Sequence, residues 1–165
     1  MKNKRTYRRK IFLILMILWM AAIFAFSSRS GDESAQDSYH AGILIGEVII
    51  PGFEEWTSEK QLQFAETIDH PVRKTAHAAE YAILGLLAAG TCISSKNSTL
   101  NIRDILYPWF IASGYAAADE FHQLFVTGRS GQVSDVLLDS AGALAGLLVL
   151  TAIRTFRHRI KNSHL

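Results

Sequence analysis

Residues 118–140, "ADEFHQLFVTGRSGQVSDVLLDS", gather side chains that could bind an anion or transfer a proton, between two apolar segments of the chain. An imidazole titrates near neutral pH, a carboxylate can orient it, and a guanidinium can hold a phosphate or carboxylate through two parallel hydrogen bonds. A second polar group lies at 73–81, "RKTAHAAEY". We take eleven side chains of the two groups as candidates, namely Arg73, Lys74, His77, Glu80, Asp119, Glu120, His122, Gln123, Arg129, Asp135 and Asp139.

The two histidines are the candidate general bases. Asp119 precedes His122 by three residues, so on a helix the carboxylate shares a face with the imidazole and could orient it. Glu80 follows His77 at the same spacing and could act likewise. The candidate catalytic residues are therefore His122, Asp119, His77, Glu80 and Glu120. The candidate substrate-binding residues are Arg129, Arg73, Lys74, Gln123, Asp135 and Asp139.

The same side chains could instead bind a divalent metal. Imidazole and carboxylate suit zinc and related ions, and the possible ligands are His77, Glu80, Asp119, His122 and Asp139. The spacings H-x-x-E and D-x-x-H match no recognised zinc motif such as H-E-x-x-H. The single cysteine, Cys92, excludes an internal disulfide and a cysteine cluster. The sequence does not define a cofactor, and a divalent metal is one alternative.

Apolar segments of membrane-spanning length must position these groups. The chain is 49% hydrophobic, and its apolar residues concentrate in four stretches. Since about 20 helical residues cross a hydrocarbon core, we predict transmembrane helices at about 11–27, 75–93, 104–126 and 133–153. The predicted fold is all-α, a single membrane domain over residues 1–165 that forms a bundle of four transmembrane helices. The basic start and first apolar run also fit a cleaved signal peptide, although the run is long for one.

The distribution of basic residues predicts the orientation. Six Lys and Arg residues lie in 2–10 and four in 154–161, whereas residues 27–72 contain only Arg29 and Lys60. Lys96 and Arg103 flank the connection between the second and third helices. By the positive-inside rule both termini are cytoplasmic and the loop at 28–73 is extracytoplasmic. The basic N-terminal stretch is read as a topology signal, so no nucleic-acid partner is expected.

This topology brings the ionisable groups to one depth. Glu80, Asp119 and Asp139 each lie six or seven residues inside an outer boundary, or roughly 9–10 Å deep. Helical spacing also predicts which way they face. Two stripes should pack against other helices, one formed by Ala112, Ala116, Asp119 and Gln123, the other by Asp135, Asp139, Gly142 and Gly146.

The long outer loop is predicted to be partly helical. Its apolar run at 41–50 is too short to span and could be interfacial or re-entrant. Residues 57–69 predict a helix with Thr57 or Ser58 as its N-cap. Together the two segments could form a lid over the polar groups.

The polar blocks resemble those of the VanZ-like family of small bacterial membrane proteins. The resemblance is carried by "RKTAHAAEYAILG" (73–85) and "DEFHQLFVTGRSGQVSDVLLDSAGALAG" (119–146), with "FSSRSG" near the end of the first helix. It implies a multi-pass protein of the bacterial cytoplasmic membrane with a role in the cell envelope. The family's namesake is associated with resistance to teicoplanin, a glycopeptide that binds cell-wall precursors outside the membrane. The resemblance supplies no reaction.

Several functions are compatible with this reading. The site could transfer an acyl or phosphoryl group on a lipid-linked cell-wall precursor or a phospholipid, or it could bind such an anionic component without chemistry. The polar cluster could also be structural, since polar side chains hydrogen-bond between packed membrane helices. Transport is a further alternative, but the predicted inner half of the bundle offers no ionisable group. The lipid bilayer is the expected partner in every case.

Overall fold

The computed structural model describes residues 2–93 and 101–163. These residues form five α-helices, one short 3₁₀ helix and no strand, which confirms the all-α prediction. Lys96, which entered the count of basic residues, lies outside the described residues. The elements in order are α1 (Lys2–Ser27), α2 (Gly31–Ile49), η1 (Phe53–Glu55), α3 (Ser58–Cys92), α4 (Ile102–Gln123) and α5 (Val133–Ser163).

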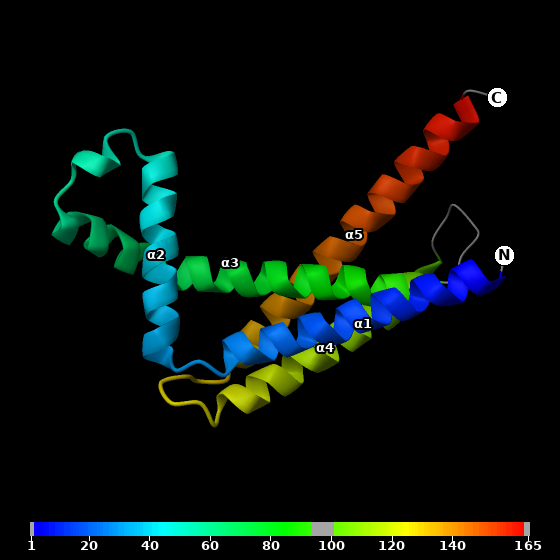
Figure 1. Cartoon of the computed structure of the whole chain (residues 1–165), viewed down its shortest axis with the longest axis horizontal. Helices are drawn as coiled ribbons and strands as arrows, with labels where there is room; N and C mark the ends of the chain where they lie inside the picture. Colours follow the sequence, from blue (N-terminus) through cyan, green and yellow to red (C-terminus); the bar gives the residue numbers. More distant parts are fainter. Residues whose placement is uncertain (1, 94–100, 164–165) are drawn as a thin grey trace.

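The long helix α3 is the centre of the arrangement, because it packs against α1, α2, α4 and α5. In Figure 1, the axes of α1, α3 and α4 are roughly aligned, with α3 antiparallel to the other two; α5 crosses them, and α2 lies across one end of the bundle. The connection between α4 and α5 lies at that same end, whereas both chain termini point toward the opposite end (Figure 1). The segments predicted to be extracytoplasmic therefore share one end of the molecule.

Two helices of the described part are long and apolar enough to cross a membrane. They are α1 over Thr6–Ser27 and α5 over Val133–Arg157, with mean hydropathies of 2.3 and 2.1. The predicted spans at 75–93 and 104–126 carry the polar candidates, which lower their mean hydropathy. Large apolar side chains are nevertheless exposed along α4 as well as α1 and α5, including Phe110 (61%), Leu18 (61%) and Leu148 (54%).

The boundary predicted between the loop and the second span is not an end of a helix. The helix expected at 57–69 and the span expected at 75–93 are one continuous helix, α3, which passes through Pro71. Proline removes one backbone hydrogen bond, but α3 is held by packing on both sides of it. Before Pro71, Ala65 packs against α2, and after it Tyr81 is buried in the core. The predicted N-cap is confirmed, since the Thr57 side chain accepts a hydrogen bond from the Lys60 backbone N at 3.4 Å.

Other helix limits also exceed the predictions. The apolar run at 41–50 is not a separate segment but falls in the second half of α2, which begins at Gly31 after a capping box formed by Ser30 and Glu33. Helix α1 starts at Lys2 and α5 continues to Ser163. The hydropathy pattern marks only the apolar part of each helix, whereas backbone hydrogen bonding continues into the basic flanks.

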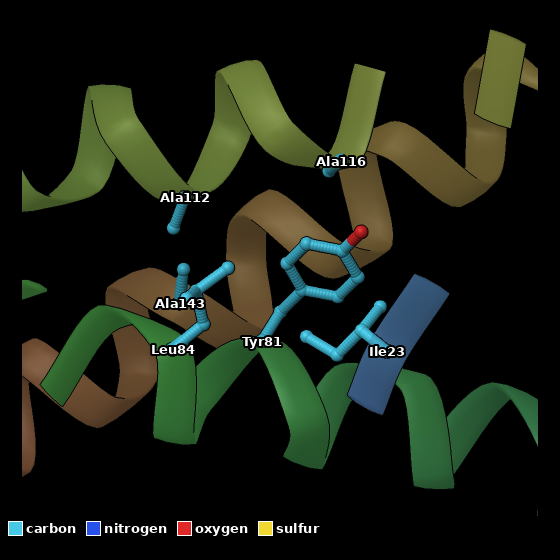
Figure 2. Packing of buried hydrophobic residues seen from close by; sticks show 6 residues of the cluster. All are labelled: Ile23, Tyr81, Leu84, Ala112, Ala116 and Ala143. Carbon is cyan, nitrogen blue, oxygen red and sulfur yellow. The ribbon is translucent and has the colours of Figure 1, made fainter. Parts of the chain in front are cut away.

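The core is built from small side chains around one tyrosine. Helices α3 and α5 meet where Gly142 and Gly146 face the backbone of Ala78 and Ala82. Such small residues let helix backbones approach closely, and the predicted stripes on α4 and α5 are confirmed as packing faces. Figure 2 shows how four helices converge on the buried cluster Ile23, Tyr81, Leu84, Ala112, Ala116 and Ala143.

Candidate functional site

A first cavity of about 210 Å³ lies among α3, α4, α5 and the loop between the last two. Most of its wall is polar. Three candidates do not line it, namely Glu80, Asp119 and His122. The candidates that do are Arg73, Lys74, His77, Glu120, Gln123, Arg129, Asp135 and Asp139.

A second cavity of about 230 Å³ lies between the end of α1, α2 and α3. It shares Arg73, His77 and Arg129 with the first cavity, so these three side chains stand between the two spaces. Glu80 belongs to this second wall. Most of the surface that faces the second cavity is carbon, supplied in part by Phe26, Ala41, Val72 and Ala76.

Arg129 has a guanidinium that forms no ion pair with a carboxylate among the described residues. Its Nε donates to the backbone carbonyl of Arg29 at 3.3 Å, and within the described residues its two terminal nitrogens have no hydrogen-bond partner. Burial lowers the pKa of Arg129, because desolvation disfavours the charged guanidinium; nearby Arg73 adds to the effect, while the carboxylates of Asp119 and Glu120 oppose it. An anion bound between the cavities would offset both contributions.

The other two cations of the first cavity are already paired. Lys74 Nζ lies 2.6 Å from Asp135 Oδ1 and joins α3 to α5. Arg73 forms an ion pair with Asp69 one helical turn earlier, and Asp69 also accepts a hydrogen bond from Ser38 of α2. The charge of Arg129 is therefore the one that remains most available to a ligand.

His77 and Glu80 are brought together as their spacing predicted. His77 Nδ1 and Glu80 Oε2 are 3.6 Å apart, which is beyond normal hydrogen-bond distance. Both atoms are buried and have no hydrogen-bond partner among the described residues. The pair therefore has unused hydrogen-bonding capacity beside Arg129, where a proton could be accepted from a bound ligand.

The structure does not pair Asp119 with His122. Asp119 is 3% exposed and accepts from the Ser27 hydroxyl, with Oγ–Oδ distances of 2.6 and 2.7 Å. His122 Nε2 lies 3.1 Å from Ser28 Oγ, and its ring stacks on Phe24 at 4.6 Å between centroids. The Ser28 hydroxyl also donates to the Phe24 carbonyl at 2.6 Å, so its oxygen is left as an acceptor on the side of His122.

His122 therefore faces α1 and lines neither cavity. The predicted orientation of His122 by Asp119 is wrong, because α1 packs against this part of α4 and supplies separate partners for the two side chains. Among the two candidate bases, His77 is the one that lines the cavities.

Two buried acids complete the first cavity. Glu120 accepts a hydrogen bond from the backbone N of Gln132 at 2.9 Å, which ties the end of α4 to the start of α5. Asp139 is 1% exposed, and its Oδ1 has no partner in the part of the chain that the structure describes. A buried oxygen without a donor is costly, so Asp139 has capacity for a ligand group that donates a hydrogen bond.

The five possible metal ligands are not brought together. Among residues 2–93 and 101–163, no three His, Cys, Asp or Glu side chains are grouped closely enough to hold a metal ion. His122 is turned toward α1, and Asp119 is occupied by Ser27. The side chains present do not fit a divalent metal, and no step of the chemistry is assigned to one.

Some residues of the site were not among the sequence candidates. Asp69 and His70 precede Arg73 and Lys74 by one helical turn, and this i,i+4 spacing was a usable signal once α3 is known to be continuous. Ser27 lies in the quoted "FSSRSG" segment, but its link to Asp119 depends on how α1 packs. Loop residues Gly128, Ser130 and Gln132 also line the first cavity.

A family model described as VanZ/LLP1 matches residues 12–154. No curated protein matches the chain. No solved structure matches it either.

Proposed function

The chain belongs to the VanZ/LLP1 family, and from that premise we propose that it binds an anionic component of the bacterial cell envelope at an outward-facing site. In the proposed topology the chain crosses the cytoplasmic membrane four times, at 11–27, 75–93, 104–126 and 133–153, and both termini are in the cytoplasm. Support comes from the two apolar helices, the excess of basic residues near both termini, and the termini pointing toward one end of the bundle (Figure 1).

In this topology α2 lies in the outer membrane interface. Its exposed residues include Leu44 (61%), Val48 (87%) and Ile49 (68%), which would contact lipid. The position of α2 across the end of the bundle favours an interfacial helix over a re-entrant one (Figure 1). The helix also covers the second cavity through Ser34 and Ala41.

The observation that carries the proposal is the unpaired guanidinium of Arg129. It is half-buried between two cavities, and its terminal nitrogens are without a partner among the described residues. A planar guanidinium binds a phosphate or carboxylate with two parallel hydrogen bonds, which an ammonium cannot do. An anionic head group of a phospholipid or a lipid-linked cell-wall precursor has the matching chemistry.

Catalysis at this site is the second candidate. The observation that favours it is His77, which lines both cavities and faces Glu80 without a hydrogen bond. A neutral imidazole beside a bound phosphate ester could accept a proton from an attacking hydroxyl. Binding alone requires Arg129 but not His77, so the two candidate functions, binding and catalysis, depend on different residues.

At the level of the cell, we propose that the protein shields or alters an envelope component and thereby lowers susceptibility to teicoplanin-type glycopeptides. The test is teicoplanin susceptibility of a sensitive bacterium that expresses wild type, Arg129→Ala or Arg129→Lys at equal membrane abundance. We expect both variants to lose protection, because Lys keeps the charge but not the two-bond geometry. Undiminished protection by Arg129→Ala would refute the assignment of the site.

A direct binding measurement accompanies the cell assay. Purified protein in amphipol is titrated with inorganic phosphate, and Arg129→Ala is the matched control. We expect saturable binding to wild type that the variant loses. Binding that is equal in both proteins would place the anion elsewhere.

A further inference from the structure

We propose that the two cavities form one bipartite site for an alkyl phosphate, with the phosphate at Arg129, its polar substituent in the first cavity and its hydrocarbon chain in the second. The inference rests on the proposed function, because it takes the anion site at Arg129 as given, and it names the class of ligand. That ligand is an amphiphile whose phosphate joins a polar group to an apolar chain.

The shared wall is the first argument. Arg73, His77 and Arg129 line both cavities, so a group bound at Arg129 has access to both. A phosphodiester has two ester oxygens that point in different directions from one anionic centre. The three shared side chains offer hydrogen-bond donors or a titratable imidazole to that centre, and the two cavities receive its two substituents.

The second argument is the difference between the two walls. The first cavity presents buried polar groups that can pair with a hydroxylated or amide substituent, including the free oxygen of Asp139 and the side chain of Gln123. The second cavity presents mostly carbon, with Phe26, Val72 and Ala76 on its wall. Burial of a hydrocarbon chain against such a wall lowers the free energy, whereas burial of a hydrated head group there does not.

Position relative to the apolar spans is the third argument. Phe26 is the next-to-last residue of the apolar span of α1 and is 57% exposed, so the second cavity lies at the edge of the apolar surface. The first cavity is lined by Gly128, Ser130 and Gln132 of the α4–α5 connection, which is outside both apolar spans, and it extends to Asp135 and Asp139 at the start of the α5 span. An amphiphile would therefore enter with its chain on the apolar side and its polar group on the loop side.

The test uses chain length as the variable. Full-length protein in amphipol is titrated with inorganic phosphate and with monobutyl, monohexyl and mono-octyl phosphate below their critical micelle concentrations. Binding to Arg129→Ala is subtracted at each length, which removes partition of the probe into the amphipol. We expect affinity to rise by up to about fourfold for each methylene group until the second cavity is filled.

Two variants fill the second cavity. Ala41→Phe on α2 and Ala76→Leu on α3 each add carbon atoms where the chain is placed, while Arg129 is left in position. We expect inorganic phosphate to bind both variants as it binds wild type, and the gain with chain length to disappear. Two variants on different helices keep the test decisive if one of them fails to fold.

The outcomes separate the two proposals. Phosphate binding with no dependence on chain length in wild type would overturn the bipartite site and leave the anion site intact. A dependence on chain length that persists unchanged in both filled variants would also overturn it. Binding of alkyl phosphates that does not require Arg129 would overturn the proposed function as well.

Discussion

The hydroxyl of Ser27 at the end of α1 hydrogen-bonds the carboxylate of Asp119, which lies on the buried face of α4 about one turn before the helix ends, with Oγ–Oδ distances of 2.6 and 2.7 Å. Both side chains are buried, at 0% and 3% exposed. Gln123 Nε2 is 3.5 Å from Asp119 Oδ2, at the limit of a hydrogen bond. Ser27 is therefore the principal donor to this carboxylate and joins α1 to α4.

Ser27→Ala should destabilise the protein by about 1–3 kcal/mol, because it leaves a buried acceptor without a strong donor. The free energy of unfolding in mixed micelles measures the effect. Asp119→Asn supplies the matched control in a double-mutant cycle, since the amide removes the charge that needs the donor. Independent effects of the two substitutions would show that the Ser27–Asp119 link contributes nothing to stability.

Gly146→Ala should separate α3 from α5. A Cβ at position 146 would lie 2.6 Å from the carbonyl oxygen of Ala82, which is backbone and cannot move aside without shifting a helix. Gly114 on α4 is the control, because a Cβ there meets nothing within 4 Å. We expect Gly146→Ala to lower the melting temperature. Gly114→Ala should leave it equal or raise it, because Ala stabilises a helix by about 0.5–1 kcal/mol relative to Gly. Equal melting temperatures for the two variants would contradict the close packing of α3 and α5.

The two histidines should differ in function. His77→Ala is expected to abolish teicoplanin protection if the site is catalytic, because His77 lines both cavities. His122→Ala is expected to retain protection per molecule, since His122 contacts Phe24 and Ser28 rather than a cavity. Susceptibility is compared at matched membrane abundance. The reverse order, with His122 essential and His77 dispensable, would show that the ligand lies outside the two cavities.

Glu33 should titrate below the ordinary range of a glutamate. A hydrogen bond from the backbone N–H of Ser30 and a second from its side chain lower the pKa of Glu33, because both favour the carboxylate. A lowered folded-state pKa means that the stabilisation of the α2 N-terminus is present above the pKa of the unfolded state and is lost as pH falls through the folded-state value. The carboxyl carbon signal of Glu33, followed by NMR between neutral and acidic pH, should report this midpoint.

Ser30→Ala is the control for that titration. It removes the side-chain bond and keeps the backbone one, so the midpoint should move part of the way back to the ordinary value. An ordinary midpoint in the wild-type protein would mean that the capping box does not form in solution.

The sequence predicted the packing faces well because helical spacing determines them. Asp119 and Gln123 are buried on α4 and Gly142 and Gly146 meet α3, as the two stripes required. Spacing places a side chain on a face, but it does not say which neighbour occupies that face. For this reason the separate partners of Asp119 and His122 on α1 could not be predicted from the positions of the two residues alone.

The start of α3 could not be predicted from the sequence for a different reason. The prediction placed a boundary between the loop at 28–73 and the span at 75–93, because an apolar segment follows the polar group at 73–81. The backbone follows packing rather than hydropathy, and α2 holds the first half of α3 through Gly42 and Ala65 while the core holds the second half. Pro71 lies inside α3, and a helix that is packed on both sides of a proline can continue through it.

The central position of α3 has a consequence for biosynthesis. Tyr81 and Leu84 leave the ribosome well before Ala143 of α5, which is one of the residues that surround them in the finished core (Figure 2). Until translation reaches α5, the small-residue face of α3 is open, and Lys74 has not yet met Asp135. Because α5 follows α1, α3 and α4 in the chain, the core shared by these four helices closes only once α5 has been made.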